Sequence, residues 1–374
     1  MSVTLKRTCL VSILLWGLVA AGCTKTQTNH RIGLLIPLTG GAASYGQNAR
    51  QGAELALQQF TSAHPDIHAE LVVEDSKGDP GTGVKAVAKL VDLDKVVAVV
   101  GCVTSGVTLA AAPIMNEKKI PIISPGASSP KLSQAGEYVF RTWPSDDFEA
   151  KRMSGFITSR GVKTLAILSV NNEYGQGLQA AMKTDLSALG GSVQVVDVET
   201  FEQGDREMRT QLLRIKEVQP DAIYFVGFPE SAVVFGRGYA EAGLHIPVYA
   251  TSAFEDPQVA DTVGNILDGT VYAKPLSESP GVATFRAAYV AAYKTAPGVV
   301  SDTSYDAVAL VLDAIQDEIE KGTQVSGAAI HNFLLQVKNY SGASGTLSFD
   351  QNGDVVKPIG LFVLKDKRFQ ELSR

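Results

Sequence analysis

Small hydroxyl and glycine residues follow two apolar segments of this chain, in positions that suit the binding of an anion. Residues 96–100 form an apolar run that predicts a buried strand, and Ser105 follows it just before a predicted helix over 107–118. A hydroxyl and the free N–H groups of a helix N-terminus can together bind a carboxylate. A second predicted strand, 120–124, leads into a loop of small residues, Gly126, Ala127 and Ser128.

We therefore predict a site for a small molecule that carries a carboxylate or a similar group. The alternative is that these loops are ordinary helix caps and turns. Two such loops on neighbouring strands favour the binding site, because the carboxyl ends of parallel strands meet at one edge of a sheet and ligands bind in the crevice beyond it.

The elements that must position these loops alternate between strand and helix. The sequence predicts a strand over 32–37, a helix over 47–59, a strand over 70–74 and a helix over 84–92, ahead of the 96–100 strand. This order predicts a parallel, doubly wound α/β sheet.

The same order of elements returns in the second half of the chain. A Tyr-Gly pair at Tyr45 recurs at Tyr174, and a Gly-Asp pair at Gly78 recurs at Gly204, with nearly the same spacing. A repeat of this length indicates two lobes of one architecture.

The N-terminus has the composition of a targeting segment. Residues 1–22 have a basic start and a short apolar stretch, as in a signal peptide. The residues up to Cys23 resemble a bacterial lipobox, which implies cleavage before Cys23, a lipid on its sulfur and a polar tether over 23–30. A plain secretory signal with a chance cysteine is the alternative. The sequence leaves open whether the anchoring membrane is an inner or an outer one.

Charge and cysteine content exclude further classes of protein. The formal net charge is −6, from 33 basic and 39 acidic residues, and no basic run is present, so we expect no nucleic-acid partner. Beyond Cys9 and Cys23 only Cys102 remains, which rules out an internal disulfide in the exported chain. We expect Cys102 to be a buried apolar residue.

Motifs for catalysis and for metal binding are also missing from the sequence. It contains no nucleophile elbow, no His-Glu-x-x-His and no phosphate-binding loop. His64 and His68 have helical spacing, but Pro65 between them predicts a loop. We therefore expect no enzyme activity, no metal and no cofactor.

In the order and spacing of its motifs, the chain resembles a type I periplasmic binding protein of the leucine/isoleucine/valine-binding branch, which serves ABC transporters. The resemblance covers roughly residues 31–364 and implies two α/β lobes joined by three crossovers that act as a hinge. It places lobe one in 31–142 plus 275–342 and lobe two in 147–272 plus 347–374. The motifs that carry it are Gly33 to Gly40, Tyr45-Gly46, Gly52 to Ala56, Gly101 to Ser105, Ile123 to Ser128, Tyr174-Gly175 and Tyr305 to Ala307.

The resemblance also implies roles for individual residues. Ser105 and Ser128 match positions that hold a ligand carboxylate, the latter by hydroxyl and N–H, and Gly126 matches one whose carbonyl accepts from a ligand ammonium. Aromatic walls of the site are implied at Tyr45, Tyr174 and Phe228.

One position departs from the family pattern. Amino-acid binders place an acid on a lobe-two loop to pair with the ligand ammonium, and that position falls near Ser252, with Glu255 close but shifted. A buried cation without a counter-charge is costly. Either Glu255, Asp256 or Asp302 supplies the charge, or the ligand is a carboxylate or amide without an ammonium group.

The chain is expected to be an extracytoplasmic substrate-binding lipoprotein, monomeric and membrane-anchored, that captures a branched-chain or other amino acid or a related carboxylate and delivers it to an ABC permease. The alternative is a sensory subunit of the same fold that binds an amide or an acid and signals to a membrane partner.

Overall fold

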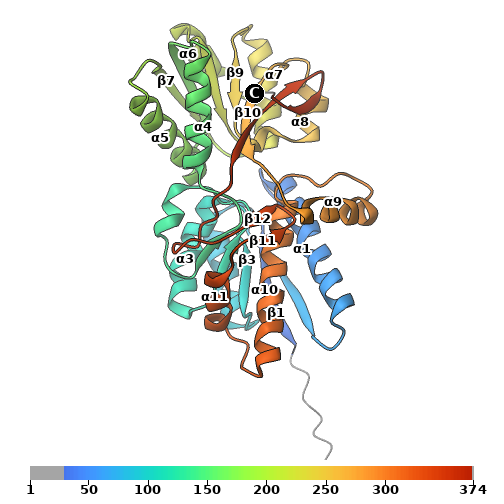
Figure 1. The fold of residues 1–374 in the computed structure, drawn as a ribbon. Helices are drawn as coiled ribbons and strands as arrows, with labels where there is room; N and C mark the ends of the chain where they lie inside the picture. The colour runs from blue at the N-terminus through green and yellow to red at the C-terminus, as the bar shows by residue number, and fades with distance from the viewer. Residues whose placement is uncertain (1–28, 373–374) are drawn as a thin grey trace, which may run out of the picture.

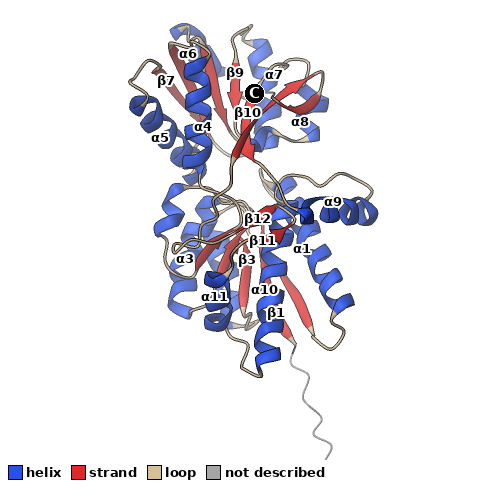
Figure 2. Ribbon diagram, in the orientation of Figure 1, coloured by secondary structure: helices blue, strands red, loops and turns tan. Residues whose placement is uncertain are grey.

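The computed structural model describes residues 29–372, which form two α/β lobes, one above the other in Figure 1. Each lobe has a sheet of its own with helices packed on it, and extended segments link the lobes near their junction (Figure 2). Two sheet-based α/β lobes confirm the predicted fold class.

Lobe one, the lower lobe, is built on a parallel five-stranded sheet in the order β2-β1-β3-β4-β5. Its central strands are short runs of valine, isoleucine and leucine whose side chains are buried, as expected where helices cover both faces. The strands are β1 His30–Ile36, β2 Ala69–Asp75, β3 Ala98–Gly101, β4 Ile122–Ser124 and β5 Val139–Arg141.

Helices from both ends of the sequence complete lobe one, because the chain returns to it after building most of lobe two. The long helix α10 packs along α1. Asp79 caps α2 by accepting from the Thr82 N–H, and Pro80 occupies the first helical position, where a missing N–H costs nothing. The helices are α1 Ala43–Ala63, α2 Pro80–Asp92, α3 Ser105–Lys118, α9 Pro280–Tyr293, α10 Ser301–Lys321 and α11 Gly327–Gln336, with a 3₁₀ turn at Pro130–Gln134.

Lobe two holds a seven-stranded sheet in the order β14-β13-β10-β9-β8-β6-β7. Five neighbouring strands are parallel, but β13 pairs with β10 antiparallel and β14 with β13 antiparallel, so the C-terminal end of the chain closes one edge. The strands are β6 Thr164–Val170, β7 Gln194–Phe201, β8 Ala222–Val226, β9 Val248–Ala250, β10 Val271–Pro275, β13 Ile359–Lys365 and β14 Arg368–Glu371.

The helices of lobe two begin directly after the first crossover. The Ser145 hydroxyl caps α4 by accepting from the Asp147 N–H, and three acidic residues fill the first turn, as the helix dipole favours. The helices are α4 Asp146–Ser159, α5 Glu173–Ala188, α6 Arg209–Val218, α7 Pro229–Glu241 and α8 Pro257–Val263, with a 3₁₀ turn at Ser252–Phe254. The sequence analysis did not predict β5 or α4.

The third crossover lies further along the chain than the sequence analysis placed it. Residues 342–347 fall in a hairpin of β11 Tyr340–Gly342 and β12 Gly345–Leu347, which packs on α9 of lobe one. A turn closed by the Phe349–Val355 bridge follows and also contacts lobe one, and only then does the chain reach β13. The residue-level division into lobes stays a prediction with this later boundary.

The predicted signal peptide and the lipid-bearing Cys23 lie outside the described residues. Of the predicted tether, His30 belongs to β1 instead, because its N–H bonds the His68 carbonyl and its side chain is buried. Within residues 29–372 no helix combines the length and the apolarity needed to cross a bilayer.

Candidate functional site

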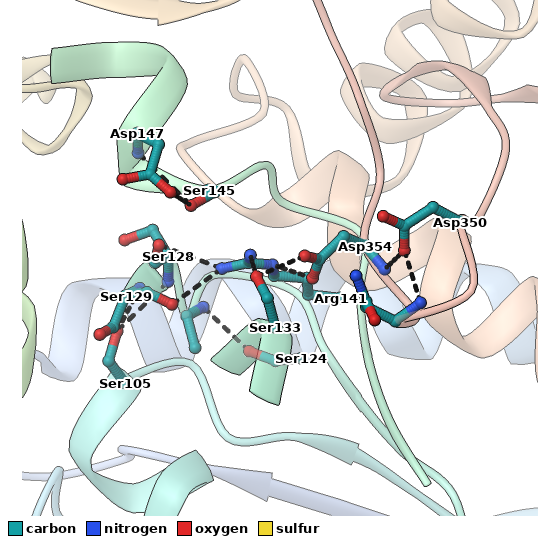
Figure 3. A network of polar contacts seen from close by, with 12 residues as sticks. Ser105, Ser124, Ser128, Ser129, Ser133, Arg141, Ser145, Asp147, Asp350 and Asp354 are labelled. Carbon is teal, nitrogen blue, oxygen red and sulfur yellow. Dashed lines mark hydrogen bonds and ion pairs between the residues drawn. The ribbon is translucent and has the colours of Figure 1, made fainter. Parts of the chain in front are cut away.

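The two loops singled out in the sequence meet at the lobe junction and are bonded to one another. Ser105 is the first residue of α3, and its Oγ accepts from the N–H groups of Ser128 at 3.2 Å and Ser129 at 3.1 Å (Figure 3). Because the Ser105 oxygen accepts two hydrogen bonds, its own O–H is left to donate elsewhere. The Ser128 N–H, which the resemblance assigned to the ligand, is engaged by Ser105.

A buried arginine braces this arrangement. Arg141, at the end of β5, is only 1% exposed, and one of its terminal nitrogens donates to the carbonyls of Ser128 and Ser129 at 3.1 and 3.0 Å. Its Nε donates to Asp354 at 2.6 Å, so the guanidinium lies between the loop that carries Ser128 and Ser129 and the segment before β13 (Figure 3). The carbonyl–guanidinium bonds fix the loop that carries Ser128.

The N-terminus of α3 adds donors that the structure leaves unused. Thr104 precedes the helix but makes no capping bond, and its buried hydroxyl has no partner among the described residues. The free N–H groups and the positive end of the helix dipole favour an anion at this point. Thr104 was not among the predicted site residues, although its place before a predicted helix could have revealed it.

Aromatic side chains from both lobes cover these donors. The Tyr45 ring of α1 and the Phe228 ring of lobe two meet edge-to-face at 5.7 Å, and Phe228 and Tyr174 lie 5.6 Å apart. The Tyr174 hydroxyl donates to Thr251 at 2.8 Å. The Ser44 N–H also donates to Glu230 of lobe two at 3.3 Å, so the lobes touch across the junction. The structure therefore shows a closed arrangement.

These residues surround a small cavity, which we call the clasp cavity. Its volume is about 20 Å³, roughly what one water molecule needs. Thr104 and seven of the nine predicted ligand-binding residues line it. Those seven are Tyr45, Ser105, Gly126, Ser128, Tyr174, Phe228 and Ser252.

The other two predicted residues lie elsewhere. Ala127 packs into the apolar core of lobe one, and its N–H donates to Ser124 Oγ at 2.9 Å. The Glu255 carboxylate approaches Lys274 to 2.5 Å and faces a neighbouring cavity instead. Both differences are tertiary in origin, since sequence proximity to Ser128 and Ser252 did not fix the direction of either side chain.

That neighbouring cavity, which we call the hinge cavity, has a volume of about 160 Å³ and lies between crossover residues such as Trp143 and Lys274 and the residues of α9 and of the start of α10. Trp143, Ser252 and Val300 line both cavities, so the two adjoin. A ligand larger than one water molecule has to use both spaces or part the lobes. Trp143 and Val300 were not predicted as site residues.

Val300 has an unusual backbone conformation for a β-branched residue. Its φ is +65°, in the left-handed region, directly before α10. Such conformations cost about 1–3 kcal/mol and collect at ligand sites. The Val300 carbonyl accepts from the Ser304 N–H, so the first turn of α10 holds this conformation beside both cavities.

Two buried acids on the first turn of α4 are the main feature that the sequence analysis missed. Burial raises the pKa of Asp146 to about 7, against a hydrogen bond from Ser128 and the charge of Arg141. Burial and the charge of Asp146 raise the pKa of Glu149 well above its ordinary value. Glu149 Oε2 accepts from Ser252 Oγ at 3.2 Å. The sequence analysis predicted no helix over residues 146–159, so it gave no reason to expect either acid to be buried.

A third buried acid holds the turn between β11 and β12 on lobe one. Asp306 of α10 accepts from the Ala343 N–H at 2.6 Å and from the Ser344 N–H and hydroxyl at 2.8 and 2.6 Å. Lys357 donates to the carbonyl and hydroxyl of Ser344. Burial raises the pKa of Asp306 to about 6, and the nearby Lys357 opposes that rise.

The described part of the chain holds no group of three or more His, Cys, Asp or Glu side chains placed to bind a metal ion. Cys102 is buried, and burial raises the pKa of its thiol, so it has the surroundings of an apolar core residue.

Comparison with known proteins identifies the family. A family model described as periplasmic binding protein matches residues 30–368. The chain belongs to this family. It is 27% identical over 333 residues to Leu/Ile/Val-binding protein homolog 3 of Brucella melitensis, covering 87% of this chain and 89% of that protein. It is 26% identical to the leucine-, isoleucine-, valine-, threonine-, and alanine-binding protein of Pseudomonas aeruginosa, covering 87% of each.

The fold comparison agrees with the sequence comparison. The structure matches the leucine binding protein LivK of Thermotoga maritima with a TM-score of 0.83 at 25% identity, over 92% of this chain and 98% of that one. These findings confirm a type I periplasmic binding protein of the leucine/isoleucine/valine-binding branch. The family consists of substrate-binding proteins rather than enzymes, and it implies a location outside the cytoplasm.

Proposed function

We propose that this protein captures an amino acid or a related small carboxylate between its lobes by hinge closure. The observation that carries the proposal is the clasp cavity, where the unused hydroxyls of Thr104 and Ser105 and the N-terminus of α3 face one point. Charge-assisted hydrogen bonds to a carboxylate are about twice as strong as neutral ones. The Pseudomonas aeruginosa relative is named for binding leucine, isoleucine, valine, threonine and alanine, each of which carries such a carboxylate.

The two lobes would contribute differently to capture. Ser105 and Ser128 of lobe one would hold the carboxylate end before closure, and the Gly126 carbonyl would accept from an ammonium group of the ligand. Tyr174 and Phe228 of lobe two, with Tyr45 opposite, would then cover the ligand and exclude water. Exclusion of water strengthens every polar contact inside the site, which favours the closed state when ligand is present.

We further propose that the captured ligand passes to an ABC permease and that a lipid on Cys23 holds the monomeric protein at the membrane. In Figure 1 the described chain begins at the end of lobe one that faces away from lobe two. An anchor attached there would leave both lobes free to open and close.

A ligand screen tests this proposal directly. Purified protein would be tested by thermal shift and by calorimetry against amino acids, aliphatic and aromatic carboxylates and their amides. We expect a carboxylate-bearing compound to stabilise the fold by RT ln(1 + [L]/Kd). If amides bind as tightly as the matching acids, or if no compound binds, the assignment of the clasp cavity to a carboxylate is contradicted.

The anchor has a separate test. In cells the Cys23→Ala variant should move from the membrane fraction to the soluble extracytoplasmic fraction, with ligand affinity unchanged. An unaltered membrane fraction would contradict lipid attachment at Cys23.

A further inference from the structure

Two buried carboxylates at the start of α4 have oxygens that the protein leaves unpaired. Asp146 is 2% exposed and Glu149 is 4% exposed, and neither Asp146 Oδ2 nor Glu149 Oε1 has a hydrogen-bond partner among the described residues. A buried, unpartnered carboxylate oxygen is costly, so each one in a native structure needs an explanation.

A second observation points to the same place. The hydroxyl of Tyr224, on β8, is also buried and also lacks a partner in the described chain. Burial raises the pKa of Tyr224, and the charges of Glu149 and Asp146 raise it further, so the phenol lies within electrostatic reach of both acids. Three buried, unpartnered polar groups from α4 and β8 therefore interact electrostatically.

Hydrogen bonds place the acids directly behind the clasp cavity. The Asp146 N–H donates to the Ser128 carbonyl at 2.8 Å, and Glu149 Oε2 accepts from the Ser252 hydroxyl. Ser128 lines the cavity from lobe one and Ser252 from lobe two. The acids thus lie behind Ser128 and Ser252, two residues that line the cavity from opposite lobes.

Among residues 29–372, no cation contributes to the pKa shift of Glu149. In the same part of the chain Arg141 lowers the pKa of Asp146 by its charge, but its guanidinium is already bonded to Asp354 and to the carbonyls of Ser128 and Ser129. Two buried acids without a cation repel one another when both are ionised, so one of them holds a proton in the free protein. The titratable groups that act on Glu149, or on which it acts, are Asp146 on α4, Tyr45 on α1, Tyr174 on α5 and Tyr224 on β8.

The acids suggested by the sequence are committed elsewhere. Glu255 pairs with Lys274, Asp256 caps α8 by accepting from the Gln258 N–H, and Asp302 accepts from the N–H of its neighbour Thr303. Neither these three acids nor Glu149 line the clasp cavity, but Glu149 is bonded to Ser252, which does.

We propose that Glu149, supported by Asp146, supplies the counter-charge for a protonated amine of the ligand, and that capture of this amine releases a proton from the acid pair. This inference rests on the proposed function and makes the ligand a zwitterion, held by α3 at its carboxylate and by α4 at its ammonium. On binding, the Glu149 carboxyl loses its proton to solvent, and the ammonium takes the place of that proton as its partner.

The test uses pairs of probes that differ only in the amino group. L-leucine, L-valine and L-alanine would be compared with 4-methylpentanoate, 3-methylbutanoate and propanoate by calorimetry near pH 6.5, in two buffers with different ionisation enthalpies. For the wild type we expect an amino acid to bind at least tenfold more tightly than its deaminated partner. We also expect the measured enthalpy to change with the buffer, as proton release requires.

The Glu149→Gln variant keeps the shape of the side chain and its bond with Ser252 but cannot ionise. We expect it to lose at least tenfold in affinity for the amino acid, to change less than threefold for the deaminated acid, and to lose the buffer dependence. Glu255→Gln, the same substitution at a nearby acid, should keep the preference for the amino acid.

Each other outcome overturns the inference. Equal binding of both probes by the wild type, or a preference lost in Glu255→Gln and kept in Glu149→Gln, removes the assignment while the carboxylate-binding function stands. If none of the probes binds, the proposed function fails and this inference fails with it. Should Glu149→Gln not fold, the wild-type preference and proton release decide the matter alone.

Discussion

The two walls of the cleft have similar backbones but carry different side chains. In lobe one, β3 ends at Gly101, and α3 follows with Thr104 before it and Ser105 as its first residue. In lobe two, β8 ends just before Gly227, and α7 follows with Phe228 before it and Pro229 as its first residue. The helix N-terminus that carries hydroxyl groups in lobe one thus carries an aromatic ring in lobe two. The fold fixes the position, and the residue there decides between polar binding and apolar cover.

A second pair of positions is alike in both lobes. Gly46 of α1 and Gly175 of α5 each pack so closely on the strand before them that a Cβ would lie 1.8 Å from the Pro37 oxygen and 1.9 Å from the Val170 oxygen. A side chain fits at neither place. The Tyr-Gly repeat therefore reflects backbone packing common to both lobes, whereas the residues at the entrances of α3 and α7 reflect the separate roles of the walls.

The largest effect is expected from removing Arg141, which holds the loop that carries Ser128 and Ser129. Arg141→Ala leaves Asp354 without its partner and frees the carbonyls of Ser128 and Ser129. Breaking a buried ion pair from one side costs about 3–5 kcal/mol. We expect a loss of that size in the free energy of unfolding, measured by urea denaturation, together with weaker ligand binding.

Asp354→Asn is the matched control, because it keeps a hydrogen-bonding side chain beside the guanidinium. It should destabilise the fold less than Arg141→Ala does. If Arg141→Ala left both stability and affinity unchanged, the polar wall would not depend on this brace.

A pH titration tests the acid at the junction of the walls. The pKa of Asp146 is raised from 3.8 to about 7, so between these values the folded state holds a proton that the unfolded state has lost. Stability of the free protein therefore falls as pH rises from about 4 to about 7, by about 1.4 kcal/mol per pH unit from this one group.

The Asp146→Asn variant lacks this titration. We expect the difference in free energy of unfolding between Asp146→Asn and the wild type to move in favour of the variant as pH rises through that range, in the absence of ligand. A difference that stays constant with pH would mean that Asp146 titrates normally.

Substitutions of Ser105 and Ser128 are expected to affect ligand affinity alike but stability differently. Ser105→Ala removes the acceptor of two buried N–H groups as well as a hydroxyl in the cavity, so it should cost about 1–3 kcal/mol in stability and a similar amount in ligand affinity. Ser128→Ala keeps both N–H bonds and should lower affinity with a smaller loss of stability. Thermal unfolding measures the stability of the two variants and calorimetry their ligand affinity. Unchanged affinity in both would contradict the assignment of these serines to the ligand carboxylate.

The smallest effect is expected at the rim, where the lobes are joined by the ion pair of Lys131 and Glu173 at 2.6 Å. Both side chains are well exposed, and such pairs contribute about 0–1 kcal/mol. Lys131→Met should therefore change ligand affinity less than fivefold, and high salt should remove the difference. A loss as large as that of Ser105→Ala would show that closure depends on the rim rather than on the walls.

Local patterns in the sequence determined much of this protein. The apolar runs around Val99 and Ile123 predicted buried parallel strands, and the alternation with helices predicted the fold class. The loops with Ser105 and Ser128 were predicted to meet, because the carboxyl ends of neighbouring parallel strands share one edge of a sheet. These features depend on residues close together in the chain, whose periodicity and capping preferences can be read directly.

Only the tertiary structure decided the rest. The sequence analysis predicted no helix at Asp146 and Glu149, and only the position of the first turn of α4 at the lobe junction buries these acids. Glu255 faces Lys274 rather than the clasp cavity, and Arg141 meets Asp354 from far along the chain, because the chain crosses between the lobes before it ends. Burial and charge pairing between distant segments are properties of the folded arrangement, and no local pattern in the sequence encodes them.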